Sequence, residues 1–531
     1  MPKNIISDLL ANENTLITST KEQIKTAYLA DERPWIVGYS GGKDSTVVVQ
    51  LIFEALYELP PQSLHKKVYI ISSDTLIETP LIMNTINQTL AHIQKAAHTY
   101  QLPIETHKVQ PTPQNSFWVN LIGRGYPSPN QKFRWCTDRL KIEPANAFIM
   151  NKVSSFGKVV MILGVREDES TSRNTSIQEH SIDGQLFMRH STLTNAFVYA
   201  PIRTFTVDDV WHYLLQTPSP WGDDNHALHR LYQDATSGEC PLIIDKQIKE
   251  SAGSCGNSRF GCWVCTVVTE DKALTGFIQS GHDWMKPLLD FRNWLTTIRD
   301  DRTKRMKYRM NGQIYFNTVR IETENNEPYV MIAKKAGREA AKIPFSHFTI
   351  LQKQDIPSYL AQHQIDLRTA DDPLILINYE ETALDGTQMQ KYAQLGLGPY
   401  TMATRQEILT RLLQLQATIQ HPNDANYQVI TEAELKEIRR IWLQQGDWED
   451  NVPNIYARIP HLPSILWERD DNPILHHDDA QQLEALCQTH HVDSTVMRKL
   501  LNLEKDYAGY KIRRGIQDEI AKILKQDYLH L

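Results

Sequence analysis

The sequence predicts an α/β fold built on a parallel sheet, followed by a helix-rich carboxyl-terminal region. Apolar strand patterns at 35–39 and 68–71 flank a helical pattern at 45–57, and strand patterns at 104–109 and 159–163 follow further helices. This β-α-β order is typical of doubly wound sheets, in which ligands bind at the carboxyl ends of the strands. Apolar residues at helical spacing near 405–415, 432–443 and 511–529 predict the later helices.

Length and composition limit the organisation of the chain. Because 531 residues exceed what one hydrophobic core usually holds, we expect a sheet domain at 1–235, a cysteine-rich segment at 236–295 and a helix-rich domain at 296–531. A net charge of −7 gives no general attraction to nucleic acid, so any DNA contact needs a local basic patch. We find no apolar targeting or membrane segment, which predicts a cytoplasmic protein without membrane contact.

A glycine-rich turn joins the first strand to its helix. Its residues are Ser40, Gly41, Gly42, Lys43, Asp44, Ser45 and Thr46. Consecutive glycines let the backbone approach an anion, and the N–H groups at a helix start attract phosphate oxygens. A Walker-type loop needs Gly at 37 and Ser or Thr at 44, where this chain has Val37 and Asp44. The turn therefore predicts a nucleotide phosphate site of another kind, with a ligand-free turn as the alternative.

Polar residues also follow the second and fourth strands. Asp74 and Thr75 end the second strand, and a carboxylate there suits a ribose or an adenine amino group. Gly164, Arg166 and Arg173 follow the fourth strand, and arginine offers planar donors to phosphate. Each residue alone suits a solvated loop end, but their common position after strands favours a nucleotide site.

Cysteines predict a metal centre. The chain has six, and four fall in one short segment: Cys240, Cys255, Cys262 and Cys265. Glycine-bearing turns allow several thiolates to converge, and disulfides are rare in the cytoplasm. Because only the last two form a C-x-x-C pair, the spacing leaves open zinc, an iron–sulfur cluster or buried cysteines without metal.

Cys136 stands apart in a cationic context. Arg134, Arg139 and Lys141 lie close to it in sequence, and adjacent cations favour a thiolate. This residue is a candidate catalytic sulfur carrier. A metal ligand and a plain packing cysteine are the alternatives.

A basic segment with aromatic neighbours follows the cysteines. Its candidate DNA contacts are Lys304, Arg305, Lys307 and Arg309. Lysine and arginine in such a run suit phosphate contacts, although a solvated helix face gives the same pattern.

Longer motifs resemble known families. The string Ser40–Ser45 resembles the loop of the PP-loop ATP pyrophosphatases, which have an adenine nucleotide α-hydrolase-like fold. The segment after Gly164 and the C-x-x-x-L-K-x-x-P stretch at Cys136 resemble the PAPS reductase branch. The strings 254–268 and 398–401 resemble the DndC family, the sulfurtransferases of DNA phosphorothioation.

The DndC resemblance implies a reaction. These enzymes split ATP between the α and β phosphates, transfer AMP to a DNA phosphate oxygen, and let sulfur displace the AMP. The resemblance implies that Lys43 and Asp44 assist this chemistry with ATP and Mg²⁺, and that a four-iron, four-sulfur cluster occupies the cysteine segment. It implies as partners DNA, a cysteine desulfurase that donates sulfur, and the ATPase and DNA-binding subunits of a phosphorothioation system.

Three other functions share some of these features. A sulfonucleotide reductase needs a late nucleophilic cysteine in a Glu-Cys-Gly context, whereas the late cysteine here is Cys487 between Leu486 and Gln488. A tRNA-thiolating ATP pyrophosphatase uses the same adenylation, but no appended RNA-binding domain is recognisable. A non-catalytic DNA-binding scaffold is disfavoured by the intact phosphate loop.

Overall fold

The computed structural model divides the chain into two compact units. Unit 1 comprises residues 1–116, 132–265 and 270–289, and unit 2 comprises 117–131, 266–269 and 290–531. The structure describes residues 3–167, 187–189, 193, 195–235, 261–331, 342–368, 372–382, 388–445, 447, 449–467, 477–490, 492, 494–507, 513 and 515–524. Of the expected cysteine-rich segment 236–295, the part 236–260 lies outside these residues.

Unit 1 is built on a six-stranded sheet with the strand order β3-β2-β1-β4-β6-β5. The strands are β1 (Trp35–Gly38), β2 (Val68–Ser73), β3 (Ile104–Val109), β4 (Val159–Ile162), β5 (Met188–Arg189) and β6 (Ala196–Tyr199). Strand β1 pairs in parallel with β2 and with β4, and only β5 is antiparallel to its neighbour within this sheet. The predicted parallel α/β core is therefore confirmed.

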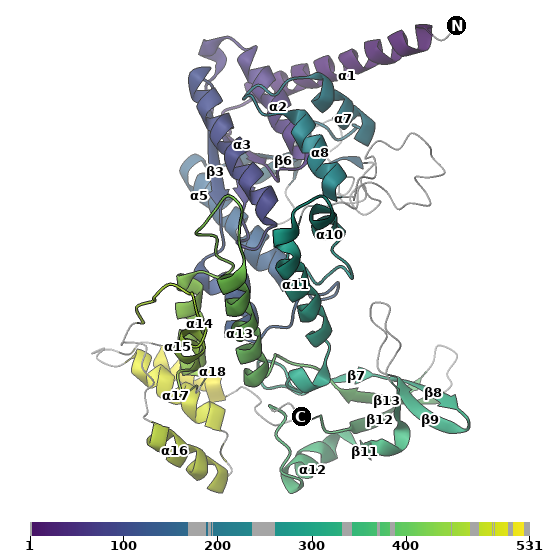
Figure 1. Ribbon diagram of the computed structural model, residues 1–531, viewed down its shortest axis with the longest axis vertical. Helices are drawn as coiled ribbons and strands as arrows, with labels where there is room; N and C mark the ends of the chain where they lie inside the picture. The colour runs from purple at the N-terminus through teal and green to yellow at the C-terminus, as the bar shows by residue number, and fades with distance from the viewer. Residues whose placement is uncertain are drawn as a thin grey trace. The chain divides into compact units, whose positions relative to one another are not determined.

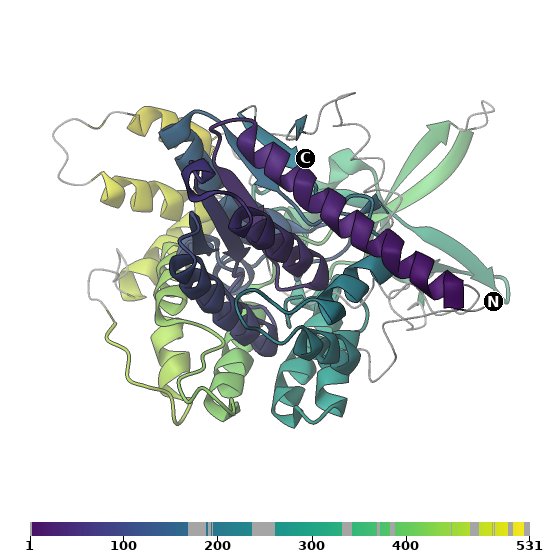
Figure 2. The same ribbon diagram turned by 90° about the horizontal axis from the view of Figure 1, so that it is seen from above.

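Helices cover both faces of this sheet (Figures 1 and 2). The helices of unit 1 are α1 (Lys3–Leu29), α2 (Lys43–Tyr57), α3 (Pro80–Thr99), α4 (Trp135–Thr137), α5 (Glu143–Phe156), α7 (Val207–Gln216), α8 (Asn225–Ala235) and α10 (Lys272–Gln279), and α11 (Lys286–Ile298) begins in unit 1 and ends in unit 2. Ile149 and Val153 of α5 pack against Ile36, Tyr69 and Ile71 on one face. Burial of such side chains contributes roughly 1.5–3 kcal/mol each, which fixes the sheet that carries the loops.

Unit 2 contains many helices and two small sheets. Its helices are α12 (Ile356–Gln362), α13 (Met402–Thr418), α14 (Glu432–Gln444), α15 (Asn451–Ala457), α16 (His477–Thr489), α17 (Ser494–Asp506) and α18 (Ile516–Leu524). Its strands are β7 (Phe316–Thr318), β8 (Arg320–Glu324), β9 (Glu327–Met331), β10 (Lys342–Pro344), β11 (Thr349–Leu351), β12 (Ile375–Thr382) and β13 (Gln388–Leu395). The expected helix-rich character is confirmed, whereas the three-stranded sheet β10-β9-β8 and the four-stranded sheet β11-β12-β13-β7 were not expected.

Close backbone approaches hold the strand segments of unit 2 together. A Cβ on Gly398 would lie 1.5 Å from the carbonyl oxygen of Tyr308, so only glycine fits there. Thr401 then caps α13 by accepting a hydrogen bond from the N–H of Thr404. These contacts give a structural role to the string 398–401.

Among the described residues, no helix is both long and apolar enough to cross a bilayer.

Candidate functional site

The glycine-rich turn forms an anion cradle at the carboxyl end of β1. Gly41 has φ +73°, and a Cβ there would lie 2.5 Å from Cγ1 of Ile86. Gly42 caps α2, and its carbonyl accepts hydrogen bonds from the hydroxyls of Ser45 and Thr46, both at 2.9 Å. The backbone therefore turns sharply after β1 and places the N-terminus of α2 at the carboxyl-terminal edge of the sheet.

An ionic chain links the cradle to the loop after β4. Nε of Arg166 donates to Oδ1 of Asp44 at 2.7 Å, and Nζ of Lys43 lies 3.3 Å from Oδ2. Arg166 is 1% exposed, and a Cβ on Gly164 would lie 3.0 Å from the backbone of Asp44. Both oxygens of Asp44 thus engage cations, an arrangement that positions Arg166 and Lys43 rather than presenting a ready ligand to Mg²⁺.

Tyr232 of α8 is a site residue that the sequence analysis missed. Its hydroxyl accepts a hydrogen bond from the backbone N–H of Lys43 at 3.2 Å, and its ring centroid lies 5.3 Å from Nζ of Lys43. Burial raises the pKa of Tyr232, so the hydroxyl stays protonated at neutral pH. Because 189 positions separate the two residues, no local motif could have revealed the contact.

The carboxylate of Asp74, which follows β2, accepts hydrogen bonds from neighbouring residues. Its Oδ1 accepts the N–H of Leu76 at 2.9 Å, and its Oδ2 accepts from Nε2 of Gln110 at 2.8 Å. Nζ of Lys108 lies 3.3 Å from the same Oδ2. The carboxylate therefore shapes the loop that carries Thr75, which is fully buried.

The loop that carries Thr75 contacts the C-x-x-C turn at Cys262. The Oγ1 atom of Thr75 lies 3.5 Å from Sγ of Cys262. An isolated antiparallel bridge pairs Glu78 with Cys262, and the N–H of Cys265 donates to the carbonyl of Cys262 at 3.0 Å. These contacts attach the predicted C-x-x-C turn to the loop after β2. Strand β2 pairs with β1, the strand that precedes the phosphate loop.

Cys136 interacts electrostatically with Cys265 of the C-x-x-C turn. Burial raises the pKa of Cys136, and the charge of Cys265 adds to this effect. Burial likewise raises the pKa of Cys262 well above its ordinary value, with the charge of Glu78 adding to it. The direction of the pKa shift of Cys136 is thus opposite to the one expected from its neighbouring cations, because burial is its largest cause.

Lys141 is the cation shared by these thiols. Its Nζ lies 2.9 Å from Oε1 of Glu78. Burial alone would lower the pKa of Lys141, but the charges of Cys262, Glu78 and Cys136 raise it. A lysine held protonated here compensates negative charge that gathers on the cysteines.

The cysteines suit a thiolate-bound metal group only in part. No three His, Cys, Asp or Glu residues form a metal-holding group within the described ranges. Cys240, Cys255 and Arg173 lie outside those ranges. Besides burial, the charge of Cys265 nevertheless raises the pKa of both Cys136 and Cys262, and the charges of those two thiols act on Lys141, whose side chain is 45% exposed. Thiolates are the ligands that zinc and iron–sulfur clusters share.

The basic segment of unit 2 corrects part of the sequence prediction. Arg305 is 5% exposed and donates to the carbonyls of Gly398 and Arg299, while Lys307 is fully buried and donates to the carbonyl of Arg302. These two cations brace the interior of unit 2, so they are not accessible to DNA in this structure.

The other two cations of the segment lie nearer the surface. Nζ of Lys304 forms an ion pair with Oε2 of Glu407 at 2.7 Å. Arg309 is exposed, with its guanidinium 4.6 Å from the ring centroid of Tyr315. Only Lys304 and Arg309 therefore stay candidates for direct phosphate contact.

Comparison with known proteins agrees with this geometry. Residues 34–268 match the phosphoadenosine phosphosulfate reductase domain family. The uncharacterized protein MJ0066 of Methanocaldococcus jannaschii is 26% identical over 219 residues, which cover 40% of this chain and 39% of that protein. The chain thus spans about two fifths of the length of this curated relative.

Solved structures in the same comparison are distant in sequence. The phosphoadenylyl-sulfate reductase of Candida auris is 15% identical with a TM-score of 0.25, and the match covers 41% of this chain and 89% of that one. The U34-tRNA thiolase NcsA of Methanococcus maripaludis, solved with its [4Fe-4S] cluster, is 14% identical with a TM-score of 0.26 and coverages of 46% and 77%. From the family match and the parallel sheet with its phosphate loop, we conclude that residues 34–268 form a phosphoadenosine phosphosulfate reductase-like domain.

Proposed function

We propose that this protein is an ATP-dependent sulfurtransferase that replaces a non-bridging oxygen of a DNA backbone phosphate by sulfur. One observation carries the proposal: the phosphate cradle follows β1, and Cys262 contacts the loop that follows β2, the parallel neighbour of β1 in the same sheet. A phosphate-activating step and a sulfur-delivering step need this proximity.

ATP supplies the activation. The cradle amides at Gly42 and Lys43 suit the β and γ phosphates, and the Lys43 ammonium suits the charge that develops on departing pyrophosphate. Arg166, held by Asp44, suits the α phosphate. When the DNA phosphate oxygen attacks the α phosphorus, a new P–O bond forms, the bond to pyrophosphate breaks, and the DNA phosphate carries AMP.

Sulfur then replaces the activated oxygen. A hydrosulfide-equivalent sulfur forms a P–S bond to the DNA phosphorus while the P–O bond to AMP breaks, and one proton is released. Cys136, Cys262 and Cys265, together with Cys240 and Cys255, are the residues that would hold a metal group. An iron–sulfur cluster at that position supplies a bound sulfide, and Lys141 would compensate the negative charge of the thiolates.

The partners in this proposal follow from the chemistry. A cysteine desulfurase supplies the sulfur as a persulfide, two thiols of excess free cysteine reduce it to the hydrosulfide level while they form a disulfide, and DNA is the acceptor. Partner subunits of a phosphorothioation system would present the DNA, and the cytoplasm would supply the ATP.

Sulfonucleotide reduction is the second candidate because of the family match. That reaction needs a mobile nucleophilic cysteine late in the chain. Cys487 lies within α16 and is 5% exposed, so its thiol is packed rather than presented. This burial favours sulfur transfer over reduction.

The test measures three products in one reaction. The anaerobically purified chain, incubated with ATP, Mg²⁺, DNA, excess cysteine and a desulfurase, should release pyrophosphate and AMP and yield phosphorothioate dinucleotides detectable by mass spectrometry after nuclease digestion. Lys43→Ala should abolish all three products, whereas Lys158→Ala, at an exposed position before β4, should abolish none. Reduction of phosphoadenylyl sulfate to sulfite without any DNA–sulfur product would overturn the proposal.

A further inference from the structure

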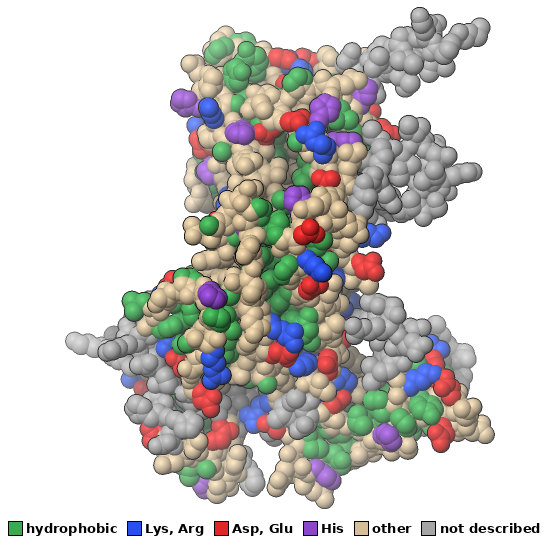
Figure 3. Space-filling view, viewed as in Figure 1, with side chains coloured by type: hydrophobic (Ala, Val, Ile, Leu, Met, Phe, Trp, Pro, Cys, Tyr) green, Lys and Arg blue, Asp and Glu red, His purple; other side chains and the backbone are tan. Residues whose placement is uncertain are grey.

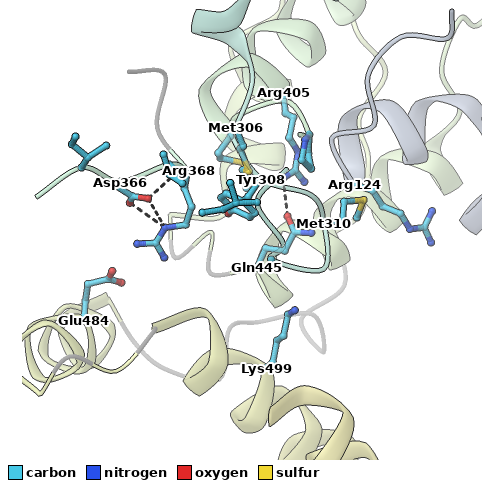
Figure 4. Close-up of a pocket in the computed structure, with 16 residues that line it drawn as sticks. Arg124, Met306, Tyr308, Met310, Asp366, Arg368, Arg405, Gln445, Glu484 and Lys499 are labelled. Atoms are coloured by element: carbon cyan, nitrogen blue, oxygen red, sulfur yellow. Dashed lines mark hydrogen bonds and ion pairs between the residues drawn. The ribbon is translucent and has the colours of Figure 1, made fainter. Parts of the chain in front are cut away.

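Unit 2 contains a cavity of about 630 Å³ that the proposed chemistry does not use. We call it the unit 2 pocket. Its wall comes from the segment 306–314, from 365–368, from Pro399 and Met402, and from residues of α13, α16 and α17 (Figure 4). This volume is in the range of pockets that bind small ligands. A DNA duplex is too large to enter it.

Charge in the pocket favours an anion. The lining holds four cations, Arg124, Arg368, Arg405 and Lys499, against the two carboxylates Asp366 and Glu484. This excess of two positive charges lies within a chain of net charge −7. On the face drawn in Figure 3, basic side chains lie among acidic ones, so a local excess is more informative than the bulk charge.

The charges are also unevenly placed. Nε of Arg368 donates to Oδ1 of Asp366 at 2.9 Å, and Glu484 lies on the same side of the pocket (Figure 4). Lys499 extends from α17 toward Gln445 on the other side (Figure 4). An anionic group would therefore be attracted to the Lys499 side, away from both carboxylates.

The other half of the wall is apolar. Met306, Tyr308 and Met310 alternate along the chain and line the pocket. Of the residues between them, Lys307 is buried, and Arg309 is exposed with its guanidinium over the ring of Tyr315. Thioethers and a phenol ring offer polarizable surfaces to a flat heteroaromatic ring. The carboxamide of Gln445 also lines the pocket near Lys499, and its Oε1 accepts a hydrogen bond from Nη1 of Arg405 at 2.7 Å (Figure 4).

We propose that the unit 2 pocket binds one unstacked nucleotide of a single DNA strand, with its base against the Met306–Met310 wall and its phosphate at Lys499. The inference rests on the proposed function, because it takes DNA as the acceptor. It adds that the chain itself reads a nucleotide, at a position of unit 2 that is separate in sequence from the phosphate loop.

The test is fluorescence anisotropy of the full chain with a short fluorescein-labelled single-stranded oligodeoxynucleotide at a fixed, stated salt concentration. Lys499→Glu and Met310→Glu should each weaken binding by about tenfold or more, because one reverses a phosphate-facing charge and the other places a carboxylate on the base-facing wall. Met310 is 47% exposed, so its substitution should leave the fold intact if Lys499→Glu does not fold.

Two controls separate nucleotide binding from general polyanion binding. Lys522→Glu makes the same charge change on α18, at a side chain 68% exposed that does not line the pocket, and should leave affinity within about twofold. An abasic oligonucleotide of equal length keeps the phosphates and should bind the unsubstituted chain at least fivefold more weakly.

Each outcome has one meaning. Equal losses in Lys522→Glu and Lys499→Glu, equal affinity for abasic and normal strands, or a preference for duplex that Met310→Glu does not alter would overturn the pocket proposal. Absence of DNA binding by the unsubstituted chain that still exchanges ATP with pyrophosphate would overturn the pocket and leave the ATP step standing. Binding that depends on the pocket, with no ATP–pyrophosphate exchange, would support the pocket and overturn the proposed sulfur transfer.

Discussion

The hydroxyl of Tyr232 accepts a hydrogen bond at 3.2 Å from the backbone N–H of Lys43, the first residue of α2. This N–H is one of the donors that a helix start offers to a phosphate oxygen. The phenol also lies close to Gly42, where an added Cβ would be 3.0 Å from its oxygen. Tyr232 therefore takes the place of an anion at the cradle, and a bound phosphate has to displace its hydroxyl.

Removal of that hydroxyl should tighten phosphate binding. In Tyr232→Phe the ring stays beside the Lys43 ammonium, but the N–H no longer has to exchange one acceptor for another. A hydrogen bond of this kind contributes about 1 kcal/mol, so the Kd for magnesium pyrophosphate should fall by up to about fivefold in isothermal titration calorimetry. Tyr199→Phe, at another buried tyrosine of unit 1, should leave this Kd unchanged. Weaker binding by Tyr232→Phe would mean that the hydroxyl donates to the ligand instead.

Steric crowding makes Gly41 irreplaceable in the cradle. Alanine at a positive φ costs about 1–2 kcal/mol, and here its Cβ would also lie 2.5 Å from Ile86. Gly157 gives a matched control, because its φ is +79° and nothing lies within 4 Å of an added Cβ. Gly41→Ala should lower ATP affinity at least tenfold, whereas Gly157→Ala should cost only stability, with ATP binding unchanged. Equal ATP affinities in the two variants would show that the cradle tolerates a side chain.

Sequence patterns predicted the elements of unit 1 because those elements depend on local periodicity. The predicted strand at 104–109 coincides with β3, and the phosphate turn lies where β1 meets α2. The contacts that organise the site are different, since Tyr232 with Lys43 and Thr75 with Cys262 join residues far apart in sequence. Only the folded sheet brings such pairs together.

The basic segment of unit 2 shows the same limit of prediction from the sequence. Its composition indicated a contact surface, but burial of Arg305 and Lys307 depends on carbonyls that the folded segment 397–400 and Arg302 provide. Met306, which lies between them, and Tyr308, which follows Lys307, line the pocket instead. A charge pattern alone could not reveal which side of the segment would face inward.

Iron analysis should identify the thiols that hold a metal group. Cys262→Ser and Cys136→Ser should each lower iron and acid-labile sulfide after anaerobic purification to less than about half, because each removes a thiolate ligand from the proposed metal group. Cys487→Ala, in α16 of unit 2, should retain the full content. Retention of iron by Cys136→Ser with loss of sulfur transfer would make this thiol the sulfur carrier. Stoichiometric zinc without iron in the unsubstituted chain would contradict the iron–sulfur assignment.

Asp31 makes the stability of unit 1 sensitive to acid. Burial alone would raise the pKa of Asp31, but hydrogen bonds from Arg33 and the charge of Lys66 lower it below 3.8. Nζ of Lys66, 2% exposed at its side chain, lies 3.2 Å from Oδ1 of Asp31. Since the folded-state pKa is depressed, the contribution of Asp31 is complete above pH 3.8 and disappears as the pH falls through the folded-state value.

Asp31→Asn should therefore lower the thermal stability of unit 1 at pH 7, by about 2 kcal/mol in free energy of unfolding, because it removes a charged acceptor from two cations. The difference from the unsubstituted chain should shrink as the pH falls below 3.8 through the folded-state pKa of Asp31, where Asp31 itself becomes protonated. Glu32→Gln gives the matched control, since Glu32 is 86% exposed at its side chain and should change stability by less than about 0.5 kcal/mol. Melting curves recorded by circular dichroism between pH 3 and 7 measure both variants. A destabilisation of Asp31→Asn that stays constant over this range would place its cause in packing rather than in the charge of Asp31.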